Sequence, residues 1–104
     1  MAGDEIRLSG QTLIVLRLFL SRPQKALSGA MITRDSSVGS GTLYPMLARL
    51  EAAGWLTSEW EQVDPKEAAR PRQRFYRLTG KGVSNTSAAL SLLSYPSGEL
   101  SWSS

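Results

Sequence analysis

Apolar residues are spaced along the chain in a way that predicts several helices. Residues 11–21 are apolar on nearly all sides, with Arg17 as the only charge, and Pro23 follows them. A helix of this kind is normally buried on more than one side. It is either the central helix of a small core or a surface for self-association. A short second helix is expected after Ser28, whose side chain suits an N-cap.

A third and longer helix is predicted over residues 40–53. Leu43, Leu47 and Leu50 recur at i, i+4 and i+7, which marks a buried face. Gly54 follows where a helix commonly ends in a left-handed glycine. Either Ser40 or Thr42 could serve as the N-cap, and the sequence leaves this choice open.

The opposite face of this third helix carries small residues: Gly41, Pro45, Ala48 and Ala52. A face that only meets water usually carries long charged side chains. This face is therefore suited to a close approach to another surface. The major groove of DNA and a partner protein are both candidates.

Alternating residues then predict two strands, over Trp55–Glu61 and Gln73–Leu78, joined by a loop over Gln62–Pro71. Thr79 is expected to cap a last helix over residues 80–94. The fold is thus expected to be mainly α with a small β-hairpin. This order is that of a winged helix-turn-helix: a three-helix core, a two-stranded wing and a C-terminal helix. We expect the domain over residues 11–79, with residues 1–10 and 95–104 as tails.

Basic charge is concentrated in one stretch. Residues 70–81 hold five of the 12 basic residues and no acid, and the preceding Glu59, Glu61, Asp64 and Glu67 have the opposite sign. Two explanations stay open. The stretches pair with each other across a hairpin, or the arginines bind nucleic acid.

Composition excludes several classes of function. The 104 residues fit one small domain and contain neither histidine nor cysteine. Thiolate and imidazole metal sites are excluded, as is catalysis with a histidine base. We therefore expect no enzyme, no metal and no cofactor. The longest apolar run, Leu13 to Leu16, is too short for a membrane span, and the acidic start of the chain favours the cytoplasm.

The motifs themselves carry a resemblance to a known family. They are Ser40–Leu56, Trp60–Glu61, Arg70–Pro71–Arg72 and Phe75–Thr79, within residues 37–82. In this order they resemble the PadR family of bacterial transcriptional regulators. The resemblance implies a dimeric DNA-binding protein of the repressor type.

The resemblance also implies which residues contact double-stranded DNA. On the third helix these are Ser40, Thr42, Tyr44 and Arg49, and on the wing Arg70, Arg72 and Arg74. Tyr44 has two alternatives: its hydroxyl meets a phosphate, or its ring packs against the second helix with the hydroxyl in water.

A homodimer is expected through apolar residues of the first and last helices: Leu13, Leu16, Leu20, Leu90 and Leu93. Some members of the family respond to planar small molecules. Trp55, Trp60 and Trp102 are either candidates for such an aromatic effector site or residues of the core or of an interface. The alternative function is a winged-helix protein-interaction module without specific DNA binding.

Overall fold

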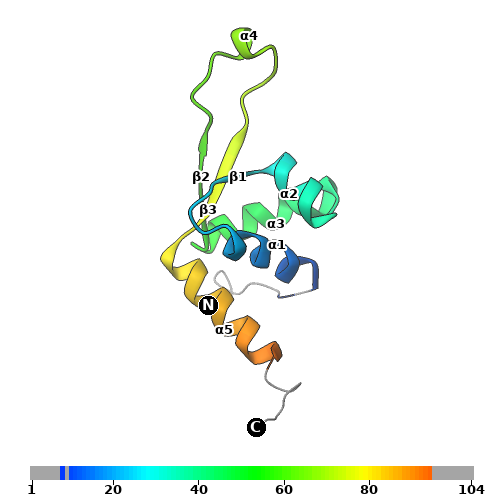
Figure 1. Cartoon of the computed structure of the whole chain (residues 1–104), viewed down its shortest axis with the longest axis vertical. Helices are drawn as coiled ribbons and strands as arrows, with labels where there is room; N and C mark the ends of the chain where they lie inside the picture. The colour runs from blue at the N-terminus through cyan, green and yellow to red at the C-terminus, as the bar shows by residue number, and fades with distance from the viewer. Residues whose placement is uncertain (1–7, 9, 95–104) are drawn as a thin grey trace.

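The computed structural model of the chain describes Leu8 and residues 10–94, with side chains up to Leu92. Its helices are α1 (Gly10–Ser21), α2 (Gly29–Ser36), α3 (Ser40–Ala52), α4 (Pro65–Ala68) and α5 (Gly80–Ser94), and its strands are β1 (Leu27–Ser28), β2 (Leu56–Trp60) and β3 (Arg74–Leu78). Helices α1 to α3 pack together at the middle of the molecule, while the β2–β3 hairpin projects from one end and α5 extends to the other (Figure 1). The expected tails lie outside the described residues, apart from Leu8 and Gly10.

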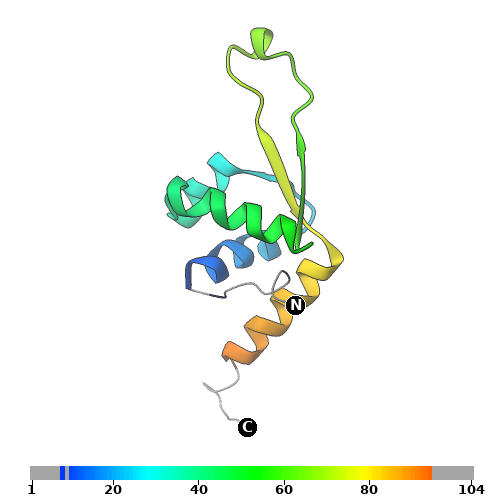
Figure 2. The same cartoon turned by 180° about the vertical axis from the view of Figure 1, so that it is seen from behind.

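This architecture confirms the predicted fold class, a mainly helical winged helix-turn-helix. Seen from behind, α3 runs across the base of the projecting hairpin, which forms the wing (Figure 2). No helix in the described part of the chain is long and apolar enough to cross a membrane.

The sheet has three strands where the sequence predicted two. The antiparallel order is β1-β3-β2, with Ser58 opposite Tyr76 on one side of β3 and Leu27 opposite Tyr76 on the other. The short strand β1 was missed, as was the four-residue helix α4 inside the predicted loop. Both predicted hairpin strands are present and slightly shorter than expected.

The core lies between α1, α2, α3 and the sheet. Leu43, Leu47 and Leu50 are fully buried, which confirms the predicted inner face of α3. Helix α1 contributes Val15, Leu16 and Phe19 to the same core, and its opposite side remains at the surface. The other buried apolar residues are Leu27, Ile32, Val38, Met46, Ala53, Trp55, Leu56 and Tyr76. Helix α1 is thus a central helix of the core on one side only.

The expected helix caps are present at α2 and at the end of α3. The Ser28 hydroxyl accepts from the backbone N–H of Met31, as an N-cap should. Gly54 has a φ of +84°, the left-handed conformation predicted after α3. These two residues set where α2 begins and where α3 ends.

The N-cap of α3 differs from both predicted alternatives. The N-cap is Gly39, which makes no side-chain capping bond, so neither Ser40 nor Thr42 caps the helix. Pro45 is therefore the sixth residue of α3. Since proline has no N–H, the carbonyl of Gly41 cannot receive the usual bond from four residues later. Gly41 itself lies at the exposed side of the helix.

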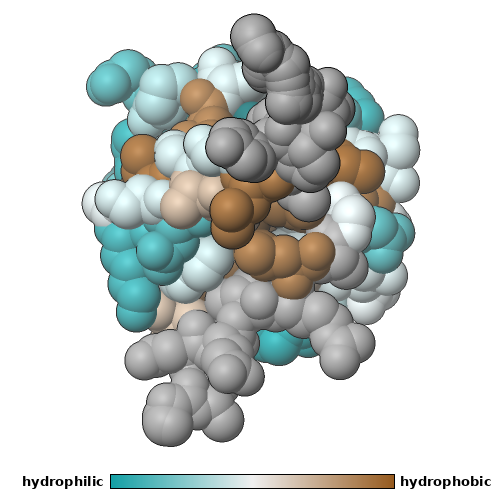
Figure 3. All heavy atoms as spheres, turned by 90° about the horizontal axis from the view of Figure 1, so that it is seen from below, coloured by the Kyte–Doolittle hydropathy of each residue, from teal (hydrophilic) through white to brown (hydrophobic). Residues whose placement is uncertain are grey.

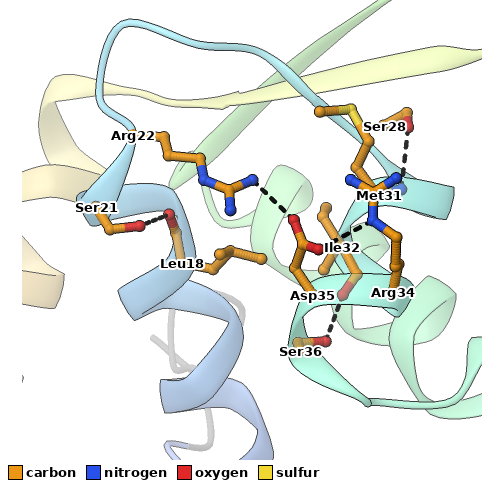
Figure 4. Close-up of polar contacts among 9 residues, drawn as sticks. All are labelled: Leu18, Ser21, Arg22, Ser28, Met31, Ile32, Arg34, Asp35 and Ser36. Atoms are coloured by element: carbon orange, nitrogen blue, oxygen red, sulfur yellow. Dashed lines mark hydrogen bonds and ion pairs between the residues drawn. The ribbon is translucent and has the colours of Figure 1, made fainter.

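An ion-paired aspartate ties the end of α1 to α2. Asp35 accepts from Arg22, which follows α1, at 2.8 Å, and from its neighbour Arg34 at 3.0 Å (Figure 4). Arg34 and then Arg22 lower the pKa of Asp35 through these hydrogen bonds. The Arg22–Asp35 pair therefore links α2 to the end of α1, just before the turn that leads into α3.

Helix α5 approaches the chain after α3 very closely at Gly82. A Cβ at this position would collide with the carbonyl oxygen of Trp55 and lie 2.8 Å from Cδ2 of Leu78. Thr79 fixes the contact, since its hydroxyl donates to the Gly54 carbonyl at 2.6 Å and accepts from the Gly82 N–H at 3.0 Å. Only glycine lets α5 leave the sheet in this direction.

Replacing Gly82 with alanine should therefore destabilise the fold by about 1–3 kcal/mol, the usual cost of overpacking. The free energy of unfolding in urea measures the loss. Gly80→Ala is the matched control, because an added Cβ there meets nothing within 4 Å. That control should be as stable as the parent or slightly more stable. Equal losses in the two variants would contradict the close contact.

Candidate nucleic-acid interface

The face of α3 opposite the core is exposed along its whole length. Gly41, Thr42, Pro45, Ala48 and Ala52 all lie at the surface, as the helical spacing predicted. These residues are small, so their side chains allow another molecule to approach the helix backbone closely. Had Thr42 and Ala48 packed inside the fold, a role in a DNA groove would have been excluded.

Arg49 is the one charged side chain on the exposed part of α3. It makes no ion pair or hydrogen bond with any residue that the structure describes. Its guanidinium thus keeps all five N–H donors for an outside acceptor. Ser40 and Thr42, which lie about two turns or more closer to the start of α3, are also exposed.

Tyr44 lies against the start of α2, as the ring-packing alternative expected, although its hydroxyl is the atom nearest Gly29. Its ring covers Gly29 so closely that a Cβ on Gly29 would collide with the Tyr44 hydroxyl and lie 2.7 Å from Cζ. The side chain is still 48% exposed. Gly29 was not singled out from the sequence, since glycine at a helix start needs no partner to explain it.

The wing arginines differ in how many hydrogen bonds and ion pairs they form with residues of the same chain. Arg70 forms two parallel hydrogen bonds with the carboxylate of Glu61, at 2.7 and 2.8 Å. Glu61 also accepts from the backbone N–H of Gln73 at 3.1 Å. Arg70 therefore holds the two sides of the wing together, as the hairpin-pairing explanation expected.

Arg74 is also engaged, at the base of the wing. Its guanidinium lies 4.9 Å from the centre of the Trp60 ring and 3.8 Å from the carboxylate of Glu51 on α3. The Ser58 hydroxyl on β2 donates to the same carboxylate at 2.7 Å. This cluster joins the last turn of α3 to both strands of the wing.

Arg72 has the greatest freedom of the three wing arginines. Only its Nε is used, donating to the carbonyl of Val63 at 2.8 Å. The four N–H groups on its terminal nitrogens point to no partner among the described residues. Of the predicted wing contacts, Arg72 is thus the best placed for a phosphate.

The charges of the wing nearly cancel. From residue 56 to residue 78 the chain has four acids, Glu59, Glu61, Asp64 and Glu67, and five bases, Lys66, Arg70, Arg72, Arg74 and Arg77. The net charge of the wing therefore attracts an anion only weakly. The wing can bind one only through individual side chains in the right places.

A cleft of about 390 Å³ separates the wing from the helices. One wall is formed by residues 28–30 at the start of α2 and by Tyr44. The other wall is formed by Trp60 and residues 70–74. The cleft brings together Tyr44 and the three wing arginines that were predicted separately. Ser40, Thr42 and Arg49 do not line it.

The three tryptophans named as effector candidates do not form one pocket. Trp55 is buried in the core, where its indole N–H has no hydrogen-bond partner, whereas Trp60 is on the wing and 53% exposed. Trp102 lies outside the described residues. Within the described part of the chain, no group of acidic residues could hold a metal ion.

The predicted dimer residues lie at the end of the molecule away from the wing. Leu13, Leu20 and Leu90 are partly buried. Leu16 is fully buried in the core of its own chain and has no surface to offer a second chain. The side chain of Leu93 lies outside the described part.

The three packed helices, the turn before α3 and the adjacent wing define a winged helix-turn-helix protein. A model of the transcriptional regulator PadR-like family matches residues 26–88, more than half of the chain. The chain belongs to the PadR-like family of transcriptional regulators. This confirms the resemblance of the motifs and the expectation that the protein is not an enzyme.

Solved structures agree with this assignment. A PadR-like transcription factor from Bacteroides fragilis is 25% identical, with a TM-score of 0.65 over 81% of this chain and 82% of that one. AbfR of Staphylococcus epidermidis is 30% identical, with a TM-score of 0.61 over 86% of this chain and 54% of AbfR. Reduced AbfR bound to DNA gives 30% identity and a TM-score of 0.60, over 82% of this chain and 57% of that one. Comparison with curated proteins gives no match.

The Arg70–Glu61 pair makes the wing sensitive to acid. Hydrogen bonds from Arg70 lower the pKa of Glu61 from 4.5 to about 2. A lowered pKa stabilises the folded wing above pH 4.5, and this contribution is lost as the pH falls through about 2. A ¹³C NMR titration of the Glu61 carboxyl should therefore show a midpoint near 2.

Arg70→Gln should move that midpoint back towards 4.5, because the main cause of the shift is removed. Arg72→Gln is the control and should leave the Glu61 midpoint nearly unchanged, since Arg72 bonds to a carbonyl instead. A midpoint near 4.5 in the unaltered protein would mean that the pair does not form in solution.

Proposed function

We propose that the protein is a sequence-specific DNA-binding transcriptional repressor that acts as a homodimer in the bacterial cytoplasm. The observation that carries this proposal is the narrow, exposed face of α3 beside a projecting wing. A helix fits the major groove of B-DNA when its outer side chains are small enough for close approach. The similarity to AbfR, which has been solved bound to DNA, supports the same partner for this chain.

In this proposal α3 enters the major groove, and its residues divide into two roles. Thr42 and Arg49 are exposed and have free donors, so they contact base edges. Ser40, at the first turn, contacts the phosphate backbone. Tyr44 lies beside this face, with its ring fixed against Gly29.

The wing lies on the backbone or in the adjacent minor groove, with Arg72 as its phosphate contact. We assign Arg70 and Arg74 a supporting role, because both are already bonded to acids of the same chain. This assignment departs from the expectation that all three arginines contact DNA equally.

A second copy of the chain covers the exposed apolar surface of α1 and α5. Ile14 is 47% and Leu92 is 73% exposed, and Val83 is also at the surface. The end of the molecule away from the wing shows this hydrophobic surface (Figure 3). Pairing here leaves both α3 helices and both wings free for the two halves of a symmetric site, about one helical turn apart.

Single substitutions separate the proposed roles on DNA. Arg72→Ala should weaken binding to cognate and random duplexes by the same factor, because a phosphate is present in every sequence. Thr42→Ala or Arg49→Ala should cost about 1–3 kcal/mol on the cognate duplex and little on random DNA. Fluorescence anisotropy at several salt concentrations measures both.

Arg17→Ala is the matched control, since Arg17 is an exposed arginine on α1 that has no ion pair or hydrogen bond with any described residue. It should change neither affinity nor preference by much. Cognate DNA comes from selection out of a random duplex pool. Binding that is absent, or that does not weaken with salt, would instead favour the protein-interaction module.

The proposed dimer is tested separately. Ile14→Glu and Leu92→Glu should each weaken self-association by about tenfold or more, because a carboxylate would have to be buried between the chains. Both side chains are exposed in the single chain, so the fold should persist. Sedimentation velocity measures the effect. Ala48→Glu on α3 is the control and should leave the dimer intact.

A further inference from the structure

The large apolar residues that the structure leaves exposed lie in two places. Leu8, Ile14, Val83 and Leu92 lie at or next to α1 and α5, where the proposed second copy covers them. The two others are Tyr44 and Trp60, which stand on opposite walls of the cleft between the helices and the wing. Because both rings line the same cleft, their apolar surface is available to whatever enters it.

The cleft has a defined place relative to a bound duplex, if the proposed function holds. The major and minor grooves of a duplex are separated by the sugar–phosphate backbone of one strand. With α3 in the major groove and the wing on the adjacent minor groove, that strand has to pass between them. The cleft is the space between these two elements.

We propose that this cleft holds the sugar–phosphate backbone of one DNA strand, with the rings of Tyr44 and Trp60 against the deoxyribose and Arg72 on the phosphate. This inference rests on the proposed function and adds Trp60 as a DNA-contacting residue. Neither the sequence motifs nor the charge of the wing had assigned it that role.

The chemistry of the two walls matches the two parts of a nucleotide backbone. Deoxyribose presents C–H groups, which pack well against aromatic rings. Phosphate needs donors, and Arg72 keeps the N–H groups of both terminal nitrogens available. A cleft of about 390 Å³ is within the range of well-formed binding sites.

Both rings are held in place before any DNA arrives. Arg74 lies over the Trp60 ring and is oriented by Glu51. Tyr44 packs on Gly29, and any larger residue at position 29 would collide with the Tyr44 hydroxyl. Side chains that are already fixed lose less conformational entropy on binding, so the contacts cost less to form.

The two kinds of contact have different signatures. A ring against a sugar releases no counterion, so Trp60 affects the affinity and leaves its salt dependence unchanged. An arginine on a phosphate contributes about 0.9 to the slope of log affinity against log salt. Both contributions are independent of sequence, since every nucleotide carries the same sugar and phosphate.

The experiment compares Trp60→Ala, Trp60→Phe and Arg72→Gln with the parent, on cognate and random duplexes across a range of salt. Trp60→Ala should lower affinity about fivefold on both duplexes, the value for burying half of a large aromatic side chain, with an unchanged slope. Trp60→Phe should restore most of the affinity. Arg72→Gln should reduce the slope by about 0.9.

Arg77→Gln is the matched control for charge. Arg77 is an exposed arginine of the same strand as Arg74, without a partner among the residues that the structure describes, on a part of the sheet that does not line the cleft. It should reduce the slope much less than Arg72→Gln. Duplexes in which one phosphate is replaced by a neutral methylphosphonate add a positional test. When the replaced phosphate is the one that Arg72 contacts, Arg72→Gln should bind as tightly as the parent.

Two failures are distinguishable. Unaltered affinity in Trp60→Ala, or an effect confined to the cognate duplex, would overturn the backbone contact while the salt-dependent binding of the parent still supports the proposed function. Parent protein that binds no duplex would overturn both. Urea unfolding of Trp60→Ala checks the fold, and Trp60→Phe provides the comparison if the alanine variant is unstable.

Discussion

Helix α3 has to serve two surfaces at once, and the rest of the structure depends on how it does so. Its leucines Leu43, Leu47 and Leu50 are fully buried, whereas its outer face carries mostly small residues, with Arg49 as its long charged side chain. Small domains bury a limited share of their surface, and here the described residues cover α3 on its leucine side. The core therefore holds α3 from behind and leaves its narrow side available.

The wing solves a different problem, since it has almost no core of its own. No residue from 61 to 73 is fully buried. Its shape comes from polar contacts: Arg70 with Glu61, Arg72 with the Val63 carbonyl, and the Asp64 side chain that caps α4. Arginines in this segment thus act as structural links first, which is why their number is a poor guide to how many of them face an outside partner.

The sequence predicted the features that depend on local spacing. The buried side of α3, the Ser28 cap, Gly54 and the two hairpin strands all follow from periods or single-residue preferences. Strand β1 could not be predicted, because two residues show no alternation and their pairing with β3 is long-range. The predicted start of α3 at residue 40 is confirmed, but its N-cap was assigned to Ser40 or Thr42 because Gly39 caps the helix without a side chain. The arginine partners and the cleft depend on how distant segments meet, and spacing along the chain does not contain that information.

The nearly balanced charge of the wing has a consequence for how the protein would search a genome. Attraction to DNA at long range depends on net charge, and it keeps many basic proteins on unrelated sequences. Acids such as Glu61 remove most of that attraction from this segment. The wing would therefore bind DNA only through direct contacts of individual side chains. If the wing lies on DNA as proposed, its carboxylates reduce its attraction to unrelated sequences without touching a base.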